Sequence, residues 1–443
     1  MERARVTRGE RGRQRSRGGG RPGGGFLFPP ALPRATVSPM PGLLPLDEAI
    51  GRVLRRARAR RAGRVPLGEA LGLRLAAPVG ADRDQPPFDR ATLDGYAVGS
   101  SDRAAGREPL AVQETVFAGG RARRRVRPGC AALLMTGAPL PPGADAVVRR
   151  EHATLLGGGE FVLLRERPRA WAGVHRRGSD ARRGEVALPA GTAVTPRVTA
   201  VLASLGAVRP RVFLPPRVAV GATGDELRPA SIRRLPHSAI RNSNGPTLEA
   251  LVRAAGGVPL RLGAAGDREE SILAMVRRGL EAADVLLVTG GVSAGDRDLV
   301  PPLLVRAGVR KVFHRIDLKP GKPAWFGVKG RTLVFGLPGN PVSAQVVFAL
   351  LVAPALAALR GEPEPGPARC PALLEGPAPR EGGRTAWRPA AVRRDGRGRL
   401  RARLLPWNGS GDFVNFAKAG ALLLRPARAP AARGGEPCEV ILL

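Results

Sequence analysis

Apolar and polar residues alternate in two different ways along this chain, and the change falls near residue 215. Before it, residues 45–60 carry apolar side chains at helical spacing, and residues 65–75 predict a second, shorter helix. Residues 80–180 are short strand-like runs between Pro/Gly turns, which predict a small β-rich domain. Residues 184–207 contain a strand, a turn and a helix beginning near Pro196, since proline suits the first helical turn.

From residue 215 to 354 the pattern becomes strand, loop and helix, repeated. We predict strands at 217–221, 285–289 and 332–335, and helices at 246–255, 271–280, 299–307 and 342–359, the last with Pro341 at its start and Asn340 as N-cap. This alternation is typical of a three-layer, parallel α/β domain, whose ligand binds where strands end and helices begin. After Arg360, a Pro-rich linker and four strand-like segments (385–388, 400–405, 421–425, 440–443) predict a second β domain.

Residues 1 to about 40 are rich in Arg, Gly and Pro and have almost no apolar periodicity, so they cannot bury enough surface to fold. A secretory signal is rejected because the apolar Phe26-Leu-Phe28 is cut short by Pro29-Pro30. Two interpretations remain open. One is a disordered basic arm, and the other is a true translation start at Met40, so that residues 1–39 would be absent from the mature protein.

The formal net charge of +35 would ordinarily suggest a nucleic-acid partner. However, only five of the 72 basic residues are lysine, which indicates a G/C-rich coding bias that places Arg on solvated faces. Where a Lys, Tyr or Asn is present in spite of this bias, it is therefore a candidate for a position that needs that side chain. Such residues are Lys319, Lys322, Tyr96 and Asn340.

The three cysteines, Cys130, Cys370 and Cys438, are widely spaced and form neither a disulfide framework nor a zinc pattern. This usage fits a reducing compartment, and we expect a cytoplasmic protein. The longest apolar run, 344–359, is interrupted by Pro354 and predicts a buried helix rather than a membrane span, so no membrane partner is expected.

Four loops of the predicted α/β domain follow strands, at the edge where an anion would bind. Residues 288–295 and 336–343 are Gly-rich and offer bare backbone amides to a phosphate, the second also opening a helix, although either could be a simple turn. Lys319 and Lys322 could hold a tetrahedral oxyanion. The acids in 222–227 are either N-caps or, beside phosphate loops, Mg²⁺ ligands. In the first half, 87–97 and 134–141 are dense in turn residues.

These six segments, in their order along the chain, resemble the molybdopterin molybdenumtransferase family, of the bacterial MoeA type with its plant Cnx and animal gephyrin E-domain relatives. The order is 87–97, 134–141, 222–227, 288–295, the Lys319-Pro-Gly-Lys322 string and 336–343. The resemblance runs from about Leu43 to the C-terminus and includes further matching stretches, which are Arg176-Arg-Gly-Ser-Asp180, Pro189-Ala-Gly-Thr192, Ser243-Asn244 and Gly409-Ser-Gly-Asp412. Residues Ala91-Thr-Leu93 depart from the family's commoner Ser-Ala-Met, and Phe413-Val-Asn-Phe416 departs from its usual polar-aliphatic stretch. The second departure leaves the role of Ser410 open.

The resemblance implies an α/β plus β architecture that is divided into several parts. These are the leader (1–42), a linker and dimerisation domain (43–63 plus 182–207), a β-rich domain (64–181), a molybdopterin-binding α/β domain (208–362) and a C-terminal β domain (363–443). It implies a homodimer whose active site lies between the α/β domain of one subunit and the β-rich domain of the other. The implied reaction transfers molybdate onto adenylylated molybdopterin with Mg²⁺-dependent release of AMP. Protein partners implied are the molybdopterin adenylyltransferase and molybdoenzyme chaperones.

The resemblance also implies roles for individual residues. Those implied to be catalytic are Asp94, Thr136, Asp180, Glu226, Asp267, Asp298, Lys319 and Lys322. Those implied to bind the pterin, its phosphate or molybdate are Gly290, Gly291, Ser293, Gly295, Pro338, Gly339, Asn340, Pro341, Ser343 and Ser410. The implied Mg²⁺ ligands are Glu226, Asp225 and Asp94. Catalysis would rest on positioning and electrostatics, without a covalent protein nucleophile.

Three other functions are less compatible with the sequence. An enzyme that adenylylates molybdopterin resembles only the α/β domain, and the flanking segments 43–207 and 363–443 argue against it. A non-catalytic scaffold would tolerate loss of Asp94 or of the Lys319-Pro-Gly-Lys322 string, and both are intact. A nucleic-acid binder would need aromatic side chains for base stacking, which are scarce at 4% of the chain.

Overall fold

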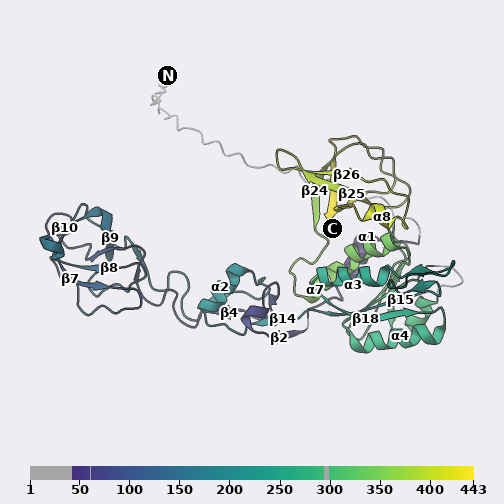
Figure 1. Ribbon diagram of the computed structural model, residues 1–443, viewed down its shortest axis with the longest axis horizontal. Helices are drawn as coiled ribbons and strands as arrows, with labels where there is room; N and C mark the ends of the chain where they lie inside the picture. The colour runs from purple at the N-terminus through teal and green to yellow at the C-terminus, as the bar shows by residue number, and fades with distance from the viewer. Residues whose placement is uncertain (1–41, 60, 294–298) are drawn as a thin grey trace, which may run out of the picture. The chain divides into compact units, whose positions relative to one another are not determined.

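The computed structural model describes residues 42–59, 61–293 and 299–443 of the chain, shown in Figure 1. The two interpretations of the leader, and the predicted roles of Gly295 and Asp298, therefore lie outside the described residues. Within the described part, strands and helices fall into a β-rich N-terminal half, an α/β domain and a C-terminal barrel.

The α/β domain is built on a six-stranded sheet with the strand order β18-β15-β19-β23-β22-β20. The strands are β15 (Arg217–Thr223), β18 (Val258–Ala265), β19 (Val285–Thr289), β20 (Arg310–His314), β22 (Trp325–Lys329) and β23 (Thr332–Leu337). The first four in this order are parallel, as predicted, but β22 pairs antiparallel with both β23 and β20. The prediction of a parallel sheet was therefore wrong at β22. Only Gly330 and Arg331 separate β22 from β23, and so short a connection can only join antiparallel strands.

Side chains of the central strands alternate between two apolar cores because successive residues of a strand point to opposite faces. Val218 and Val220 of β15 belong to a core that includes α3 (Asn244–Ala254), α6 (Pro341–Val347), α7 (Ala353–Leu359) and α1 (Leu46–Leu54). Ala219 between them belongs to a second core with α4 (Glu269–Ala282) and α5 (Val300–Arg306). The sheet thus has helices packed against both of its faces.

The predicted helix over 342–359 is one continuous helical rod in the structure. It runs through α6, a π-helical turn at Phe348–Val352 and α7, with Pro354 at the start of α7. By length and apolar composition the segment Pro341–Leu359 could cross a membrane, but 72% of it is buried inside the protein. Such burial is that of a core helix, in agreement with the sequence prediction.

The N-terminal half differs from the prediction at one helix. Residues 65–75 form only a 3-10 turn (η1, Leu67–Glu69) followed by β3 (Arg74–Leu75). The reason is tertiary, since β3 and β2 (Ala62–Arg64) both pair with β14 (Arg211–Phe213). Similarly β4 (Val79–Gly80) pairs with β13 (Val186–Leu188). Residues 74–80, which the predicted division assigned to the β-rich domain, therefore pair with segments next to α2 (Pro196–Ser204), whose N-cap is the side chain of Thr195.

The β-rich domain contains a six-stranded sheet in the order β10-β11-β7-β8-β6-β9. Its strands are β6 (Gly95–Val98), β7 (Leu110–Val116), β8 (Cys130–Leu134), β9 (Ala146–Arg149), β10 (Ala153–Leu156) and β11 (Phe161–Leu164). A smaller pair in the same domain joins β5 (Arg90–Ala91) to β12 (Val174–His175). Outside this domain, β16 (Leu227–Arg228) pairs with β17 (Ile240–Arg241), and β1 (Leu44–Pro45) pairs with β21 (Ile316–Asp317). Tyr96 of β6, the only tyrosine of the chain, is buried in the six-stranded sheet. The position that kept this side chain is therefore a core position.

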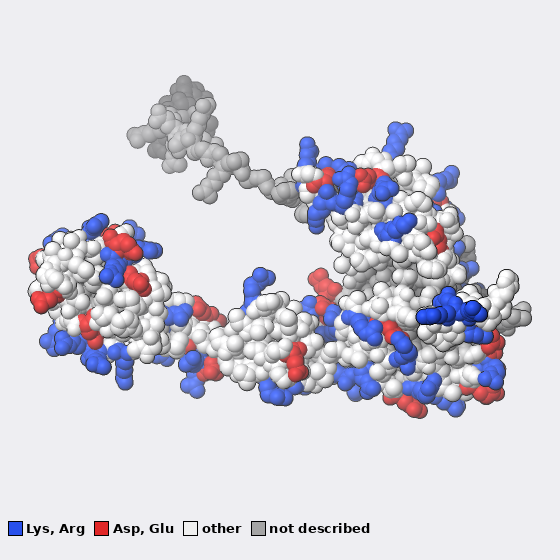
Figure 2. All heavy atoms as spheres, in the orientation of Figure 1, with Lys and Arg blue, Asp and Glu red and all other residues white. Residues whose placement is uncertain are grey.

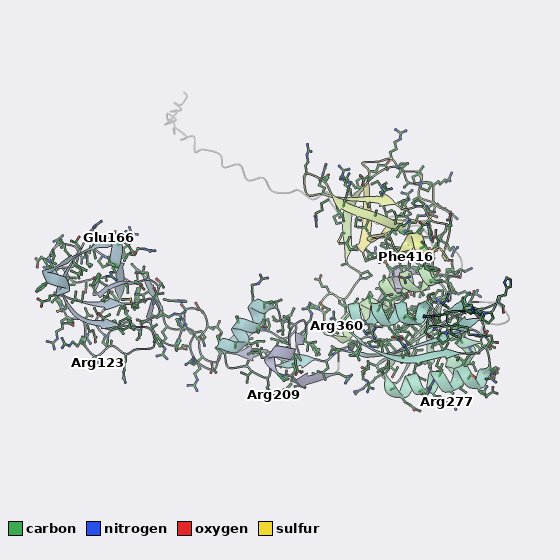
Figure 3. The ribbon with its side chains drawn as sticks, in the orientation of Figure 1. Arg123, Glu166, Arg209, Arg277, Arg360 and Phe416 are labelled. Atoms are coloured by element: carbon green, nitrogen blue, oxygen red, sulfur yellow. The ribbon has the colours of Figure 1, made fainter. Side chains whose placement is uncertain are left out.

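The C-terminal segment closes into a small barrel, β24-β26-β25-β27-β28. Its strands are β24 (Arg369–Leu374), β25 (Ala386–Arg394), β26 (Leu400–Leu404), β27 (Ala421–Arg425) and β28 (Pro437–Leu442). Trp387 of β25 and Phe416 of α8 (Phe413–Phe416, labelled in Figure 3) belong to the same apolar core as the α/β sheet. The barrel therefore shares a core with the domain that precedes it.

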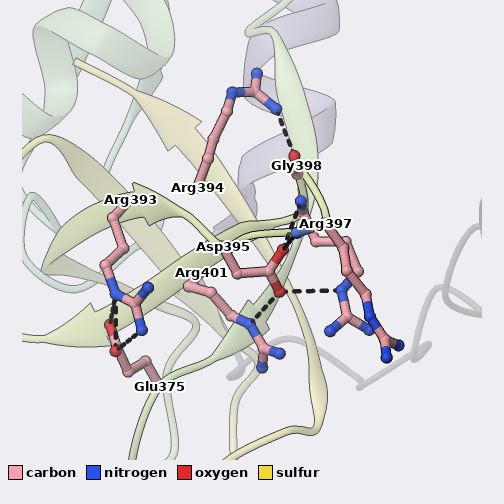
Figure 4. Close-up of polar contacts among 8 residues, drawn as sticks. Glu375, Arg393, Arg394, Asp395, Arg397, Gly398 and Arg401 are labelled. Atoms are coloured by element: carbon pink, nitrogen blue, oxygen red, sulfur yellow. Dashed lines mark hydrogen bonds and ion pairs between the residues drawn. The ribbon is translucent and has the colours of Figure 1, made fainter.

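The turn between β25 and β26 is organised by Asp395, shown in Figure 4. Its carboxylate accepts hydrogen bonds of 3.0 Å from the backbone N–H groups of Arg397 and Arg399 and from the Nε atoms of Arg399 and Arg401. Burial raises the pKa of Asp395, but these hydrogen bonds outweigh it, and the net effect holds the pKa well below its usual range.

We expect Asp395→Asn to destabilise the protein at neutral pH and to lose that effect in acid. Because the folded-state pKa is lowered, the charge stabilises the fold above the unfolded pKa near 4 and stops doing so as the pH falls through the folded value. Chemical unfolding of both proteins between about pH 7 and pH 2 measures the difference. Glu48→Gln is the control, because it removes an exposed ion pair with Arg52 on the same helix. This variant should change the free energy of unfolding little at any pH. A difference for Asp395→Asn that does not shrink in acid would contradict this assignment.

Basic side chains are scattered over the face shown in Figure 2, with acidic ones between them. Many basic groups pair locally, as Arg393 does with Glu375 on the barrel and Arg261 with Glu249 beside α3. On this face the charge does not form a continuous basic track, which agrees with its interpretation as a solvated surface.

Candidate functional site

A cavity of about 530 Å³ opens at the ends of the parallel strands of the α/β domain. Loops following β15, β19 and β23 line it together with residues around the start of α3, as expected for a parallel sheet in which strand ends meet at one edge. Its lining includes polar or acidic side chains of Glu226, Asp267, Asn242, Asn244 and Ser293.

Backbone conformation explains the glycine that follows β19. Gly290 has φ +95°, a left-handed conformation that side chains rarely adopt. A Cβ placed there would lie 2.5 Å from the carbonyl oxygen of Thr223, at the end of the neighbouring strand β15. The two strand ends can approach this closely only because the residue has no side chain, so the bare amides of the loop remain open to a ligand.

We expect Gly290→Ala to destabilise the protein and to weaken ligand binding in the cavity. The left-handed backbone alone costs roughly 1–2 kcal/mol for alanine, and the contact with Thr223 adds to it. Thermal unfolding and binding titration measure the two effects. Gly184→Ala is the matched control, because Gly184 has φ +84° but no atom within 4 Å of the point that a Cβ would occupy, so this variant carries the conformational cost alone. Equal destabilisation by both variants would contradict the close approach.

A hydrogen-bonded network of Asn and Thr side chains joins the walls of the cavity. The Nδ2 of Asn244, the first residue of α3, donates to Thr289 Oγ1 at 2.9 Å and to the carbonyl oxygen of Gly339 at 2.7 Å. Thr289 Oγ1 in turn donates to the carbonyl oxygen of Pro338 at 2.9 Å. Asn244 and Thr289 thus fix the second Gly-rich loop relative to the first. The sequence prediction had no role for Thr289 or Asn242 here, although three of the five asparagines line this cavity.

Acidic residues lie in the cavity lining and next to it. Asp225 and Asp267 hold each other's loops, since Asp225 Oδ1 accepts from the Asp267 backbone N–H at 3.0 Å and Asp267 Oδ2 accepts from the Asp225 N–H at 3.3 Å. Asp225 is not among the lining residues, whereas Glu226 and Asp267 are. Among the residues that the structure describes, no group of three or more His, Cys, Asp or Glu is placed to hold a metal ion. One or two carboxylates nevertheless suit Mg²⁺, which usually takes its other ligands from water and substrate phosphate.

Asn340 occupies the N-cap position of α6, but its side chain does not cap the helix. Its Nδ2 donates instead to Ser410 Oγ at 2.8 Å, and the Ser410 carbonyl accepts from the Val342 N–H at 3.2 Å. The sequence prediction of a capping asparagine is therefore corrected, because the side chain is engaged by the C-terminal barrel domain. This contact places Ser410, whose role was open, beside the second Gly-rich loop.

The two lysines of the Lys319-Pro-Gly-Lys322 string differ in surroundings. Lys319 donates from Nζ to Glu381 Oε1 at 3.0 Å, whereas Lys322 is exposed and has no ion-pair partner among residues 42–59, 61–293 and 299–443. Gly321 between them has φ +122°, and a Cβ there would lie 2.7 Å from Val347 Cγ2. The neighbouring Pro323 lines the cavity, so the string borders the site.

The predicted residues of the β-rich half form two small clusters of their own. Asp94 Oδ1 accepts from both the backbone N–H and the hydroxyl of Thr136, each at 2.7 Å, and these hydrogen bonds lower the pKa of Asp94. Asp180 Oδ1 lies 2.8 Å from His175 Nε2. His175 was missed in the sequence because a lone histidine carries no signal. Neither cluster contributes to the lining of the cavity.

The structure thus brings together some of the predicted site residues and leaves others apart. Those lining the cavity are Glu226, Asp267, Gly290, Gly291, Ser293, Pro338, Gly339, Asn340 and Pro341. Those described but not lining it are Asp94, Thr136, Asp180, Asp225, Lys319, Lys322, Ser343 and Ser410. Ser343 is buried within α6.

Comparison with known families divides the chain into three matched regions. Residues 44–206 match the family described as MoeA N-terminal region (domain I and II), 219–358 the probable molybdopterin binding domain, and 371–443 the MoeA C-terminal region (domain IV). The cavity lined by residues 222–341 therefore lies within the region matched to the probable molybdopterin binding domain.

Individual relatives agree with this division over most of the chain. A molybdopterin molybdenumtransferase of Bacillus subtilis is 33% identical over 406 residues, covering 90% of this chain and 94% of the relative. One from Staphylococcus aureus is 30% identical over 408 residues, covering 90% and 95%. The crystal structure of a molybdopterin biosynthesis MoeA protein from Pyrococcus horikosii is 31% identical, covers 90% of this chain and 99% of its own, and superposes with a TM-score of 0.77. The chain therefore belongs to the MoeA family of molybdopterin molybdenumtransferases, transferases of molybdenum cofactor biosynthesis.

Proposed function

We propose that this protein inserts molybdenum into molybdopterin, by transferring molybdate onto the dithiolene of adenylylated molybdopterin with Mg²⁺-dependent release of AMP. The observation that carries the proposal is the cavity itself. It is lined by two Gly-rich loops at strand ends, 289–293 and 338–341, and by the carboxylates of Glu226 and Asp267. Backbone amides suit the phosphates of a nucleotide-linked pterin, and carboxylates suit a divalent cation beside them.

Each part of the site has a physical task in this reaction. Gly290, Gly291 and the Pro338–Pro341 loop shape the pterin-phosphate pocket, which Asn244 and Thr289 keep in register. Lys319, Lys322 and Ser293 hold the oxyanion as compact donors, and Ser410 adds a hydroxyl through its contact with Asn340. Glu226 and Asp267 would hold Mg²⁺, which would neutralise phosphate charge. Catalysis then depends on orientation and fixed charge, without a protein nucleophile.

Asp94, Thr136 and Asp180 complete the proposed site across a homodimer. In one chain they form clusters outside the cavity lining, while the family resemblance implies that they meet the α/β domain of a partner subunit. Asp94 would supply a further carboxylate for Mg²⁺, whereas Asp225 is committed to the loop of Asp267. Transfer of product to molybdoenzymes in the cytoplasm, through chaperones, fits the same role.

The test of this function is a reconstituted reaction. Purified protein is mixed with adenylylated molybdopterin, molybdate and Mg²⁺, and both AMP release and cofactor formation are followed. We expect AMP release that depends on molybdate and on Mg²⁺. Tight pterin binding without turnover would replace the proposal by a scaffold role, and absence of pterin binding would refute it.

A further inference from the structure

The C-terminal barrel domain places a buried carboxylate beside Lys319, one of the two lysines proposed above to hold the oxyanion. Glu381 precedes β25, and its side chain is only 2% exposed. Its Oε1 accepts from Lys319 Nζ at 3.0 Å and from the Gly382 N–H at 3.1 Å. Its Oε2 lies 3.1 Å from Arg388 Nε. Glu381 therefore stands between two cations, one from each of two domains.

The second of these contacts is an ion pair without hydrogen-bond alignment, since Glu381 Oε2 and Arg388 Nε are both buried and lack a hydrogen-bond partner among the described residues. A buried carboxylate is tolerated only when cations compensate the loss of water. Burial raises the pKa of Glu381, but the Gly382 N–H, Lys319 and Arg388 lower it by more, so the net shift is downward. The group is ionised in the folded protein at neutral pH.

The same segment also holds the backbone of Lys319. The Lys319 N–H donates to the Thr385 carbonyl at 2.9 Å, and the Trp387 N–H donates to the Lys319 carbonyl at 2.9 Å. Arg384 Nη1 contacts the neighbouring Leu318 carbonyl at 3.4 Å. Residues 381–387 thus fix Lys319 at both ends, through its peptide groups and through its ammonium.

We propose that Glu381 is a positioning residue for the reaction, which holds the Lys319 ammonium at the edge of the site so that its remaining N–H donors face the oxyanion. An ammonium has three donors and Glu381 takes one of them, which fixes the direction of the other two. This inference rests on the proposed function for the substrate, molybdate, but the contact with Lys319 stands independently of it.

Glu381→Gln is the informative variant because both carboxylate oxygens face cations. An amide of the same shape has one NH₂ group, so it must turn a donor towards either Lys319 or Arg388. Glu381→Asp keeps the charge and shortens the side chain by one methylene, and it should restore part of the effect. Comparing the two variants separates the effect of losing the charge from the effect of disturbing the fold.

The first measurement is independent of activity. Lysine acylation followed by peptide mass spectrometry reports on each of the five lysines. We expect Glu381→Gln to speed acylation of Lys319 roughly tenfold, the scale of one hydrogen bond between charged groups, while Lys329, which donates to the Ala307 carbonyl, stays unchanged. Unchanged labelling of Lys319 would overturn the proposal.

The second measurement is steady-state kinetics. We expect Glu381→Gln to raise KM for molybdate about tenfold, with KM for adenylylated molybdopterin unchanged, and Glu381→Asp to recover part of the loss. A purely structural role would move both KM values and the unfolding temperature together, and that result would overturn the proposal. If the wild type lacked molybdate-dependent turnover while Lys319 labelling still responded to Glu381→Gln, the proposed function would fail and the contact would stand.

Glu375→Gln is the matched control for both measurements. Glu375 also belongs to the barrel domain and pairs with an arginine, Arg393, whose Nε lies 2.9 Å from its Oε1, but this pair is exposed and does not involve Lys319 (Figure 4). Its substitution should leave both Lys319 labelling and KM for molybdate at wild-type values. A Glu375→Gln protein that behaved like Glu381→Gln would assign the effect to barrel charge in general and overturn the role of Glu381.

Discussion

Lys322→Ala should reduce molybdate-dependent AMP release about 100-fold or more, which is the usual scale for removing one donor to a developing or bound oxyanion. Lys322 is exposed at the border of the cavity, in a chain where arginine replaces lysine almost everywhere. A compact ammonium can approach a small tetrahedral anion more closely than the flat guanidinium can, so Lys322→Arg should recover little. Initial rates of AMP release at saturating pterin measure both variants.

Lys311→Ala supplies the control, because Lys311 is an exposed lysine of β20 that does not line the cavity. It should keep the wild-type rate. Full activity of Lys322→Arg would show that any cation suffices at this position, and it would contradict the argument from lysine scarcity. Full activity of Lys322→Ala would remove Lys322 from the oxyanion site.

Trp387→Ala should have the largest effect on stability, about 3–5 kcal/mol, because it removes a large core side chain. Trp387 is fully buried, at 0% exposure, in the apolar core shared by the barrel and the α/β sheet. Its backbone N–H also donates to the Lys319 carbonyl, so a cavity there should loosen the segment that we propose binds the oxyanion. Calorimetric unfolding of wild type and variant measures the difference.

Trp171→Ala is the matched control for that loss. Trp171 is 39% exposed and packs under the guanidinium of Arg176, with Cζ 4.4 Å from the ring centroid. Its removal should cost about 1 kcal/mol. Comparable destabilisation by the two substitutions would mean that the barrel does not depend on the shared core.

Much of the fold could be predicted from periodicity, because the α/β elements are long and strongly patterned. The strand predicted at 285–289 has the observed bounds, and the helix predicted over 342–359 departs from the observed Pro341–Leu359 by one residue. The short segment 65–75 could not be predicted in the same way. Its apolar residues fit a helix, but Arg74–Leu75 forms a strand because it pairs with β14, which lies more than a hundred residues later.

In the candidate site too, some features could be predicted from the sequence and others could not. Glycines at strand ends indicated the two loops of the cavity, since Gly290 stands where its φ of +95° and the nearby Thr223 exclude other residues. The partner of Asn340 could not be predicted, because Ser410 lies seventy residues away and the sequence pattern at Asn340 equally favours a helix cap. Glu381 carried no signal at all, since an isolated acid in a polar segment looks solvated until the fold buries it.

The order of the elements, the Gly-rich loops and the lysines can be read from the sequence, because they depend on local conformation and on side-chain types that few positions require. Which side chains meet is a matter of tertiary structure, namely Asn340 with Ser410, Asn244 with Thr289 and Lys319 with Glu381. These pairs join residues far apart in the chain, and packing rather than local pattern sets their distance. Their energies depend on burial, which is a property of the whole fold and of no single segment.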